Sequence, residues 1–453
     1  MAETFDLILR GGVIVNQDGI AEGDIAVRNG RIADIGSFRS NLAAEVLDLA
    51  GLHVLPGVID SQVHFREPGN EHKEDLNTGS RAAVKGGVTA VFEMPNTVPP
   101  TVEEASLEDK LGRAREGMFC DFAFWVGGTR DNIDRLAELE RLPGACGIKV
   151  FMGSSTGSLL VPDDESVERI LAATSRRVAF HSEDEFRLRE RLAERRENEP
   201  QTHTDWRDVQ TALQATTRLV ALARRTGRRI HILHVSTAEE MLMLAGYRDV
   251  ATVEVTPQHL TLAAPEAYRR LGTLAQMNPP IREAHHREAL WWGVVAGVAD
   301  VIGSDHAPHT LAEKGEPYPK SPSGMPSVQT LVPVMLDHVN AGRLSLERLV
   351  DLTSHGPARV FQIAGKGRIA AGYDADFTIV DLGRRVSISN AWIESRCGWT
   401  PFAGTEVAGW PVGTIIRGRR VMWEDEIIGE PGGEPVRFLE TLSPVAEPVP
   451  AEA

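Results

Sequence analysis

The stretch HVLPGVIDSQVH (residues 53–64) has the composition of a buried β-strand that turns polar near its end. Seven more short apolar stretches follow it, separated by segments with helical spacing such as 74–87 and 208–227. These stretches are VTAVFEM (88–94), FCDFAFWV (119–126), CGIKVFM (146–152), RVAFHS (177–182), RIHILHV (229–235), ATVEVT (251–256) and DVIGSD (300–305). Eight strands alternating with helices predict an α/β fold, a (β/α)8 TIM-like barrel, with an open doubly wound sheet as the alternative.

The two ends of the sequence have a different pattern. Residues 4–55 alternate apolar and polar side chains between glycine-containing turns, and similar runs return at 372–382 and 413–423. Such alternation is typical of β-hairpins with one buried face. We therefore predict three parts: a small β-sandwich domain built from residues 1–54 and 366–430, the barrel at 55–365, and a Pro/Glu-rich tail at 431–453.

Composition and charge restrict the function classes. The chain has 453 residues, 42% hydrophobic and 25% charged, which is typical of a soluble globular protein. Its longest apolar stretches are too short and too interrupted to span a bilayer, so we expect no membrane partner. A net charge of −16 disfavours nucleic acid, whereas a small anionic substrate remains possible. Three widely spaced cysteines predict reduced thiols and a cytoplasmic protein.

Polar side chains stand at or near the carboxyl ends of five predicted strands. They are His64, Lys149, His181, His234 and Asp305. Catalytic groups in a parallel barrel project from these ends. A single one of these residues could be a hydrogen-bonded core or rim residue, and Lys149 could simply pair with a carboxylate. As a set they would be costly to desolvate without a metal, so they predict a metal site in the barrel mouth.

The first and last strands carry the strongest local signals. Asp60, Gln62, His64 and Arg66 fall on one face of the first strand, because side chains alternate between faces. A row of polar side chains on the inward face of a barrel strand indicates a functional site. The segment DVIGSDHAPH (300–309) ends its strand in Asp305, which is placed to bind a metal or to accept a proton.

Ten motifs follow one another along the chain from residue 56 to residue 404. They are PGVIDSQVHFREPG (56–69), GGVTAVFEMPNT (86–97), GIKVFM (147–152), HSED (181–184), HVST (234–237), NPPIR (278–282), SDHAPH (304–309), TSHGPARVFQI (353–363), GYDADFTIVDL (372–382) and TPFAG (400–404). This ordered series resembles the dihydroorotases of the cyclic amidohydrolase branch, in the amidohydrolase superfamily. The resemblance covers the chain from the first strand to about residue 423.

The resemblance implies a zinc-dependent hydrolase of a cyclic amide. Relatives hold up to two zinc ions bridged by a carboxylated lysine, which Lys149 matches. His181 and His234 match ligands of the more exposed ion, and His64 and Asp305 match ligands of the more buried one. Zinc would activate the attacking water, and Asp305 would act as general base and then acid. The implied reaction is the reversible hydrolysis of dihydroorotate to N-carbamoyl-aspartate, in pyrimidine biosynthesis.

One position departs from this pattern. Many relatives carry a second histidine where this chain has Gln62, and an amide oxygen is a weaker zinc ligand than an imidazole nitrogen. The buried metal position is therefore left open between an ion bound through Gln62, a water molecule and no occupant.

Four residues bear on the substrate, which the resemblance identifies as an anionic cyclic ureide. Arg66, Asn96 and His309 match residues that hold the ring carboxylate, and Asn278 would contact the ring or cap a turn. A guanidinium suits a carboxylate, although Arg66 could instead pair with Glu67 or another acid. The alternatives are a hydantoinase or allantoinase, and a non-catalytic scaffold. Relatives also lead us to expect a homo-oligomer.

Overall fold

A computed structural model describes residues 4–153 and 159–442, and its strands form two separate sheets. Eight parallel strands pair in chain order in the first sheet. They are β6 (Val58–Val63), β7 (Val88–Glu93), β8 (Asp121–Gly127), β9 (Ala145–Phe151), β10 (Val178–His181), β11 (Ile230–Ile232), β12 (Ala251–Val255) and β13 (Val301–Ile302). The last strand returns to the first through a parallel bridge between Val63 and His306. The predicted (β/α)8 barrel is thereby confirmed.

The barrel strands are buried along their whole length. This burial follows from their position, since a parallel sheet in such a fold is covered on both faces. Buried polar groups therefore stand out against an apolar background, and Asp60, Lys149 and His181 are examples.

Helices surround the barrel. They are α1 (Leu76–Lys85), α2 (Glu104–Gly117), α3 (Leu136–Leu139), α4 (Asp164–Ala173), α5 (Glu185–Glu190), α6 (His203–Trp206), α7 (Val209–Thr226), α8 (Ala238–Leu244), α9 (Pro257–Thr261), α10 (Glu266–Leu271), α11 (Ala284–Val295), α12 (Leu311–Lys314), α13 (Leu331–Asn340), α14 (Leu346–Val350) and α15 (Gly356–Phe361). Among the described residues, no helix combines the length and apolar character needed to cross a membrane.

The two predicted helical segments begin and end at capping residues. Asp75 accepts a hydrogen bond from the Thr78 amide at the start of α1, and Asp208 does the same for Thr211 at the start of α7. Gly227 follows α7 with φ +67°, a conformation that glycine adopts without steric penalty.

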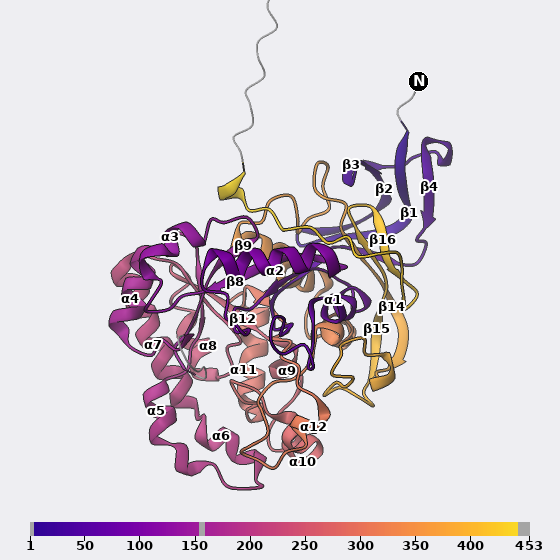
Figure 1. Ribbon diagram of the computed structural model, residues 1–453. Coiled ribbons are helices and arrows are strands. Elements are labelled where there is room, and N and C mark those ends of the chain that lie inside the picture. The colour runs from indigo at the N-terminus through magenta and orange to yellow at the C-terminus, as the bar shows by residue number, and fades with distance from the viewer. Residues whose placement is uncertain (1–3, 154–158, 443–453) are drawn as a thin grey trace, which may run out of the picture.

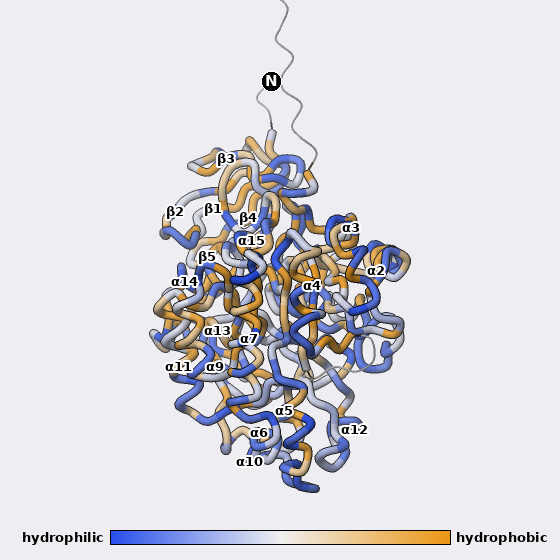
Figure 2. Tube along the Cα trace, turned by 90° about the vertical axis from the view of Figure 1, so that its left-hand side faces the viewer, coloured by the Kyte–Doolittle hydropathy of each residue, from blue (hydrophilic) through white to orange (hydrophobic). Residues whose placement is uncertain are grey.

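The second sheet joins the two ends of the chain, as predicted. It contains β1 (Phe5–Asn16), β2 (Gly19–Arg28), β3 (Arg31–Gly36), β4 (Ala43–Asp48), β5 (His53–Pro56), β14 (Phe377–Ser387), β15 (Glu406–Ile416), β16 (Arg419–Trp423) and β17 (Glu426–Ile427). The antiparallel pairing of β5 with β14 connects the N-terminal and C-terminal strands. Figure 1 and the perpendicular view in Figure 2 both place β1–β4 at one end of the molecule and α5, α6, α10 and α12 at the other.

The predicted first strand, 53–64, is in fact two strands in different sheets. Residues 53–56 form β5, whereas 58–63 form β6 of the barrel. Gly57 lies between them, where an added Cβ atom would come within 2.3 Å of the Thr89 hydroxyl. A glycine is therefore required at this crossing point, and apolar periodicity alone does not detect it.

Part of the predicted tail lies against the barrel. Residues 431–442 are described, and Val436 and Phe438 within them are buried. Pro435 forms a parallel bridge with Phe122 of β8. The rest of the predicted tail, 443–453, lies outside the described residues, and the predicted domain boundaries remain predictions.

A buried cluster of charges connects the barrel to the small domain. The ammonium group of Lys366 lies 2.7 Å from Asp121, the first residue of β8, and also pairs with Asp376, just before β14. Asp374 lies 3.3 Å from the same ammonium. All four side chains are buried. Although burial opposes its charge, the three carboxylates raise the pKa of Lys366, so the ammonium remains charged at neutral pH.

Loss of this ammonium should destabilise the protein strongly. We expect Lys366→Ala to lower the free energy of unfolding by about 3–5 kcal/mol, because the buried Asp376 loses its counter-charge, whereas Asp121 keeps Arg417 and Asp374 keeps Arg437. Chemical denaturation monitored by circular dichroism measures this change. Arg368→Ala is the control, since Arg368 forms only an exposed pair with Asp18 and should leave the midpoint unchanged. Equal midpoints for the two variants would contradict the prediction.

Candidate active site

A small cavity lies at the carboxyl ends of the barrel strands. Its volume is about 100 Å³. Eight of the nine predicted site residues line it: His64, Arg66, Asn96, Lys149, His181, His234, Asn278 and Asp305. The ninth, His309, lies next to it, with its Nε2 atom 3.4 Å from Nη2 of Arg66. The structure thus brings together residues that the sequence distributes over more than 240 positions.

Two pairs of side chains have the spacing of ligands that share a metal ion. Nδ1 of His181 and Nε2 of His234 are 3.1 Å apart. Nε2 of His64 and Oδ1 of Asp305 are 3.2 Å apart. Two ligands at about 2.0–2.1 Å from a tetrahedral zinc ion are separated by about 3.3 Å, so both pairs fit one ion each.

The three imidazoles are also in the protonation state that metal binding requires. Burial is the largest influence on each ring and lowers the pKa of His64, His181 and His234. Neutral rings therefore prevail at neutral pH, and a neutral imidazole offers a lone pair to a metal.

Lys149 lines the same cavity as these pairs. Within the described residues, no three His, Cys, Asp or Glu side chains form a metal cluster. The Nζ atom of Lys149 is buried and has no hydrogen-bond partner in the described chain. Burial lowers its pKa to about 7, against the opposing effect of Asp305 and Glu254. A substantial fraction of this amine is therefore neutral and nucleophilic at pH 7.

Gln62 makes a contact that bears on the buried metal position. Its Nε2 group donates a hydrogen bond to Oδ1 of Asp305 over 3.0 Å, while its Oε1 atom is buried without a partner in the described residues. The same Asp305 oxygen faces His64. The Gln62 side chain therefore points its NH2 group, and not its oxygen atom, at the Asp305 carboxylate.

Arg66 carries a positive charge at the edge of the cavity without an acidic partner. Its Nε group donates to the carbonyl of Pro308 over 3.2 Å, and no carboxylate among the described residues forms an ion pair with it. Glu67, which sequence reasoning considered as a partner, pairs instead with Arg113 at 3.1 Å. Arg66 is therefore available to an anionic ligand.

Comparison with known proteins places this site in a family. The profile of the amidohydrolase family matches residues 53–421. The chain belongs to the amidohydrolase family. It is 36% identical to a dihydroorotase of Methanosarcina mazei, over 98% of this chain and 99% of the relative. An allantoinase of Deinococcus radiodurans is 34% identical, over 96% and 99% of the two chains.

Solved structures agree with this assignment. The L-hydantoinase (dihydropyrimidinase) of Arthrobacter aurescens superposes with a TM-score of 0.91 at 30% identity, covering 96% of this chain and 100% of that one. The resemblance inferred from the ordered motifs is thereby confirmed. The protein is a cyclic amidohydrolase, from a family whose members are generally metal-dependent.

The amidohydrolase supports His181 with a buried ion pair that sequence reasoning missed. Nε2 of His181 lies 2.7 Å from a carboxylate oxygen of Glu183, which also pairs with Arg207. Burial opposes ionisation of Glu183, but Arg207 and His181 outweigh it and lower the pKa of the carboxyl group. An acid two residues after a histidine at a strand end was the available signal.

Two further residues near the predicted site also escaped sequence reasoning. Lys73 lies with its Nζ atom 3.3 Å from Nδ1 of His309, and the same ammonium pairs with Glu313 at 3.1 Å. His203 lies 2.9 Å from Oδ1 of Asn278 and orients that amide. Lys73 comes from a loop and His203 begins the short helix α6, so no strand pattern singles out either residue.

Three residues of this site have a strained backbone. Arg66, His234 and Asp305 have positive φ angles of 66°, 39° and 46°. Residues other than glycine rarely adopt this region, and it costs roughly 1–3 kcal/mol where the surroundings enforce it. The strained backbone aims these three side chains into the cavity mouth, at the expense of stability.

The buried amine of Lys149 should make the stability of the metal-free amidohydrolase depend on pH. Its folded-state pKa is about 7, whereas an unfolded lysine has a pKa of about 10.4. Between these values the unfolded chain binds more protons, so stability increases as the pH rises through this window. We expect Lys149→Met to remove this increase and to stabilise the metal-free protein at pH 7 by a few kcal/mol.

Denaturant unfolding of chelated protein at pH 7 and pH 9, in buffer free of carbon dioxide, measures this effect. Lys320→Met is the control, because Lys320 is exposed. If Lys149→Met retained the pH dependence of the wild type, the lysine would not be its source.

Proposed function

We propose that this amidohydrolase is a dihydroorotase, which catalyses the reversible hydrolysis of dihydroorotate to N-carbamoyl-aspartate. The observation that carries the proposal is the unpaired cation of Arg66 at the mouth of a cavity of about 100 Å³. Hydantoin and allantoin rings have no carboxylate for this charge. Dihydroorotase relatives from archaea, at 35–37% identity, support the same assignment.

Arg66, Asn96 and His309 would hold the ring carboxylate. Burial is the main cause that lowers the pKa of His309, with Arg66 and Lys73 adding to it, so the ring is neutral beside these cations. The Nε2 atom of this ring lies 3.1 Å from the carbonyl of Ser323, so its single N–H would have to exchange that partner for the substrate carboxylate. The guanidinium of Arg66 supplies the bidentate, charge-assisted contact. Asn278, oriented by His203, would contact the ring amide.

Zinc is the metal that we propose, bound by Lys149, His181 and His234. The orphaned Nζ atom of Lys149 fits N6-carboxylation, which converts the neutral amine into an anionic ligand. Imidazole nitrogens with a carboxylate-like oxygen are a donor set that zinc prefers. We propose a single ion, because Gln62 donates to Asp305 and leaves the second position without an additional nitrogen ligand. A bound zinc ion supplies Lewis acidity and a water that can attack at neutral pH.

Asp305 would carry the proton in both directions of the reaction. It lines the cavity beside His64 and Gln62. As general base it takes the proton of the attacking water, and as general acid it returns the proton to the departing ring nitrogen. Its hydrogen bond from Gln62 fixes the position of one carboxylate oxygen.

We also propose a cytoplasmic homo-oligomer that acts on small molecules and has no nucleic-acid partner. The buried free thiols of Cys120, Cys146 and Cys397 favour a reducing compartment. The net charge of −16 disfavours association with polyanions.

Arg66→Ala separates this proposal from its alternatives. We expect kcat/KM for dihydroorotate to decrease about 100-fold, because a charge-assisted contact worth about 3 kcal/mol is lost, with metal content unchanged. Arg135→Ala, which removes an exposed guanidinium paired with Glu138, should retain wild-type activity. If the wild type ignores dihydroorotate but hydrolyses hydantoin or allantoin, the substrate assignment is wrong. If the metal-loaded protein hydrolyses none of these three compounds, the result would favour a non-catalytic scaffold.

Glu183→Gln tests the metal assignment. Loss of the carboxylate leaves His181 without its anionic partner, and such changes weaken metal binding about 10–100-fold. Elemental analysis after dialysis against graded chelator should show earlier loss of zinc than in the wild type. Glu190→Gln, an exposed change on α5, is the control. Equal zinc retention in both variants would argue against zinc on His181.

A further inference from the structure

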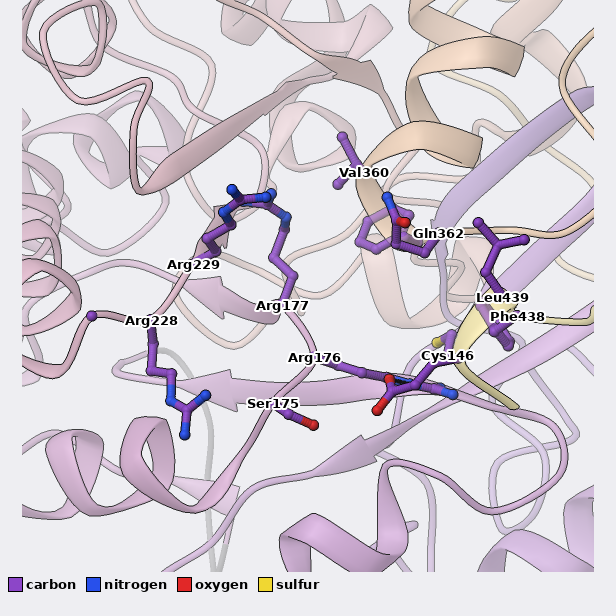
Figure 3. A pocket seen from close by; sticks show the side chains of 13 residues that line it. Cys146, Ser175, Arg176, Arg177, Arg228, Arg229, Val360, Gln362, Phe438 and Leu439 are labelled. Carbon is purple, nitrogen blue, oxygen red and sulfur yellow. Dashed lines mark hydrogen bonds and ion pairs between the residues drawn. The ribbon is translucent and has the colours of Figure 1, made fainter. Parts of the chain in front are cut away.

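A second cavity lies at the opposite end of the barrel strands. It has a volume of about 670 Å³ and is much larger than the candidate active site. Arg176 and Arg177 line it immediately before β10, and Arg228 and Arg229 line it immediately before β11. The amino ends of these strands form this cavity (Figure 3), whereas their carboxyl ends lead to His181 and His234. We call it the basal arginine cavity.

Positive charge is concentrated in the basal arginine cavity of an otherwise acidic protein. Four arginines line it, against one carboxylate, Glu440. That carboxylate is already shared, since it lies 3.1 Å from Arg176 and 2.9 Å from Arg141. The side chain of Arg228 donates to the carbonyl of Ala172. The remaining positive charge at the cavity is therefore not neutralised by the lining side chains.

Arg177 and Arg229 form the centre of this charge. Figure 3 shows their guanidinium groups beside one another at one side of the cavity. Burial, and next the charge of Arg229, lower the pKa of Arg177 to about 10. Arg177 donates one hydrogen bond to the carbonyl of Ile230, but its Nε group is buried without a partner in the described residues. Neither guanidinium forms an ion pair with a described carboxylate.

The charges around Arg177 partly offset one another. Asp300 attracts its guanidinium, whereas Arg359 and Arg248 add to the repulsion that it experiences. Both pair with Asp300, so their positions are fixed. The guanidinium groups of Arg177 and Arg229 repel each other, and neither forms an ion pair with a described carboxylate. A bound anion would reduce this repulsion.

We propose that the basal arginine cavity binds a small phosphate-bearing anion, up to the size of a mononucleotide. A phosphate dianion presents three terminal oxygens, which match the forked donors of two guanidinium groups better than a single carboxylate does. The volume lies within the usual range for small-molecule sites, roughly 300–1,000 Å³. Val360 and Phe361 provide apolar lining for an organic group. The site is independent of the proposed dihydroorotase reaction.

Calorimetric titration with pyrophosphate and with adenosine 5′-monophosphate at low salt tests this proposal on the full-length protein. We expect both to bind, and adenosine not to bind. Arg229→Ala should weaken binding at least tenfold, because an exposed guanidinium is removed without disturbing the core. Arg115→Ala, an exposed change on α2, should bind like the wild type. Arg177→Lys, which keeps the charge but loses the fork, should also bind more weakly.

Three results would overturn the proposal. One is the absence of pyrophosphate binding to the wild type. Another is equal affinity in Arg229→Ala, Arg177→Lys and the wild type. The third is binding of citrate as tight as that of pyrophosphate, with the same dependence on Arg229, since this would remove the preference for phosphate. Circular dichroism of each variant verifies that it is folded. If Arg229→Ala does not fold, Arg177→Lys still tests the proposal.

Discussion

Closure of the barrel is the constraint on which the rest of the structure depends. The bridge between Val63 and His306 brings the first and last strands together. It places His64 beside Asp305, and it lets Gln62 donate to the same carboxylate. No local segment contains this arrangement. The site exists only when the parallel ladder has been completed around the ring.

Desolvation then determines what the gathered side chains can do. Burial keeps the imidazoles neutral and makes the Lys149 amine weakly basic. The same burial would destabilise Glu183 if Arg207 did not compensate its charge. An environment that penalises ions retains the Glu183 carboxylate in a pair with Arg207, and it leaves the Lys149 amine free for a ligand. Burial of these side chains therefore favours the chemistry of the amidohydrolase and also lowers its stability.

Sequence reasoning reached the barrel and the lining of the site because polar residues at strand ends violate the apolar pattern of buried strands. His181 and Asp305 were visible in this way. It did not separate β5 from β6, since the crossing at Gly57 depends on the distant Thr89. It also did not find Arg207 or Lys73, because their partners lie on other elements. Sequence patterns show which side chains are unusual for a buried strand. The tertiary structure determines which residues those side chains contact.

The pairing of β5 with β14 has a consequence for synthesis on the ribosome. The N-terminal strands emerge first, but their partner follows only after the whole barrel has been translated. At roughly 5–20 residues per second, this delay lasts tens of seconds. Throughout that time one edge of the nascent sheet stays unpaired, and such edges recruit other chains. The protein therefore has an interval of exposure to aggregation, in which a chaperone would be most useful.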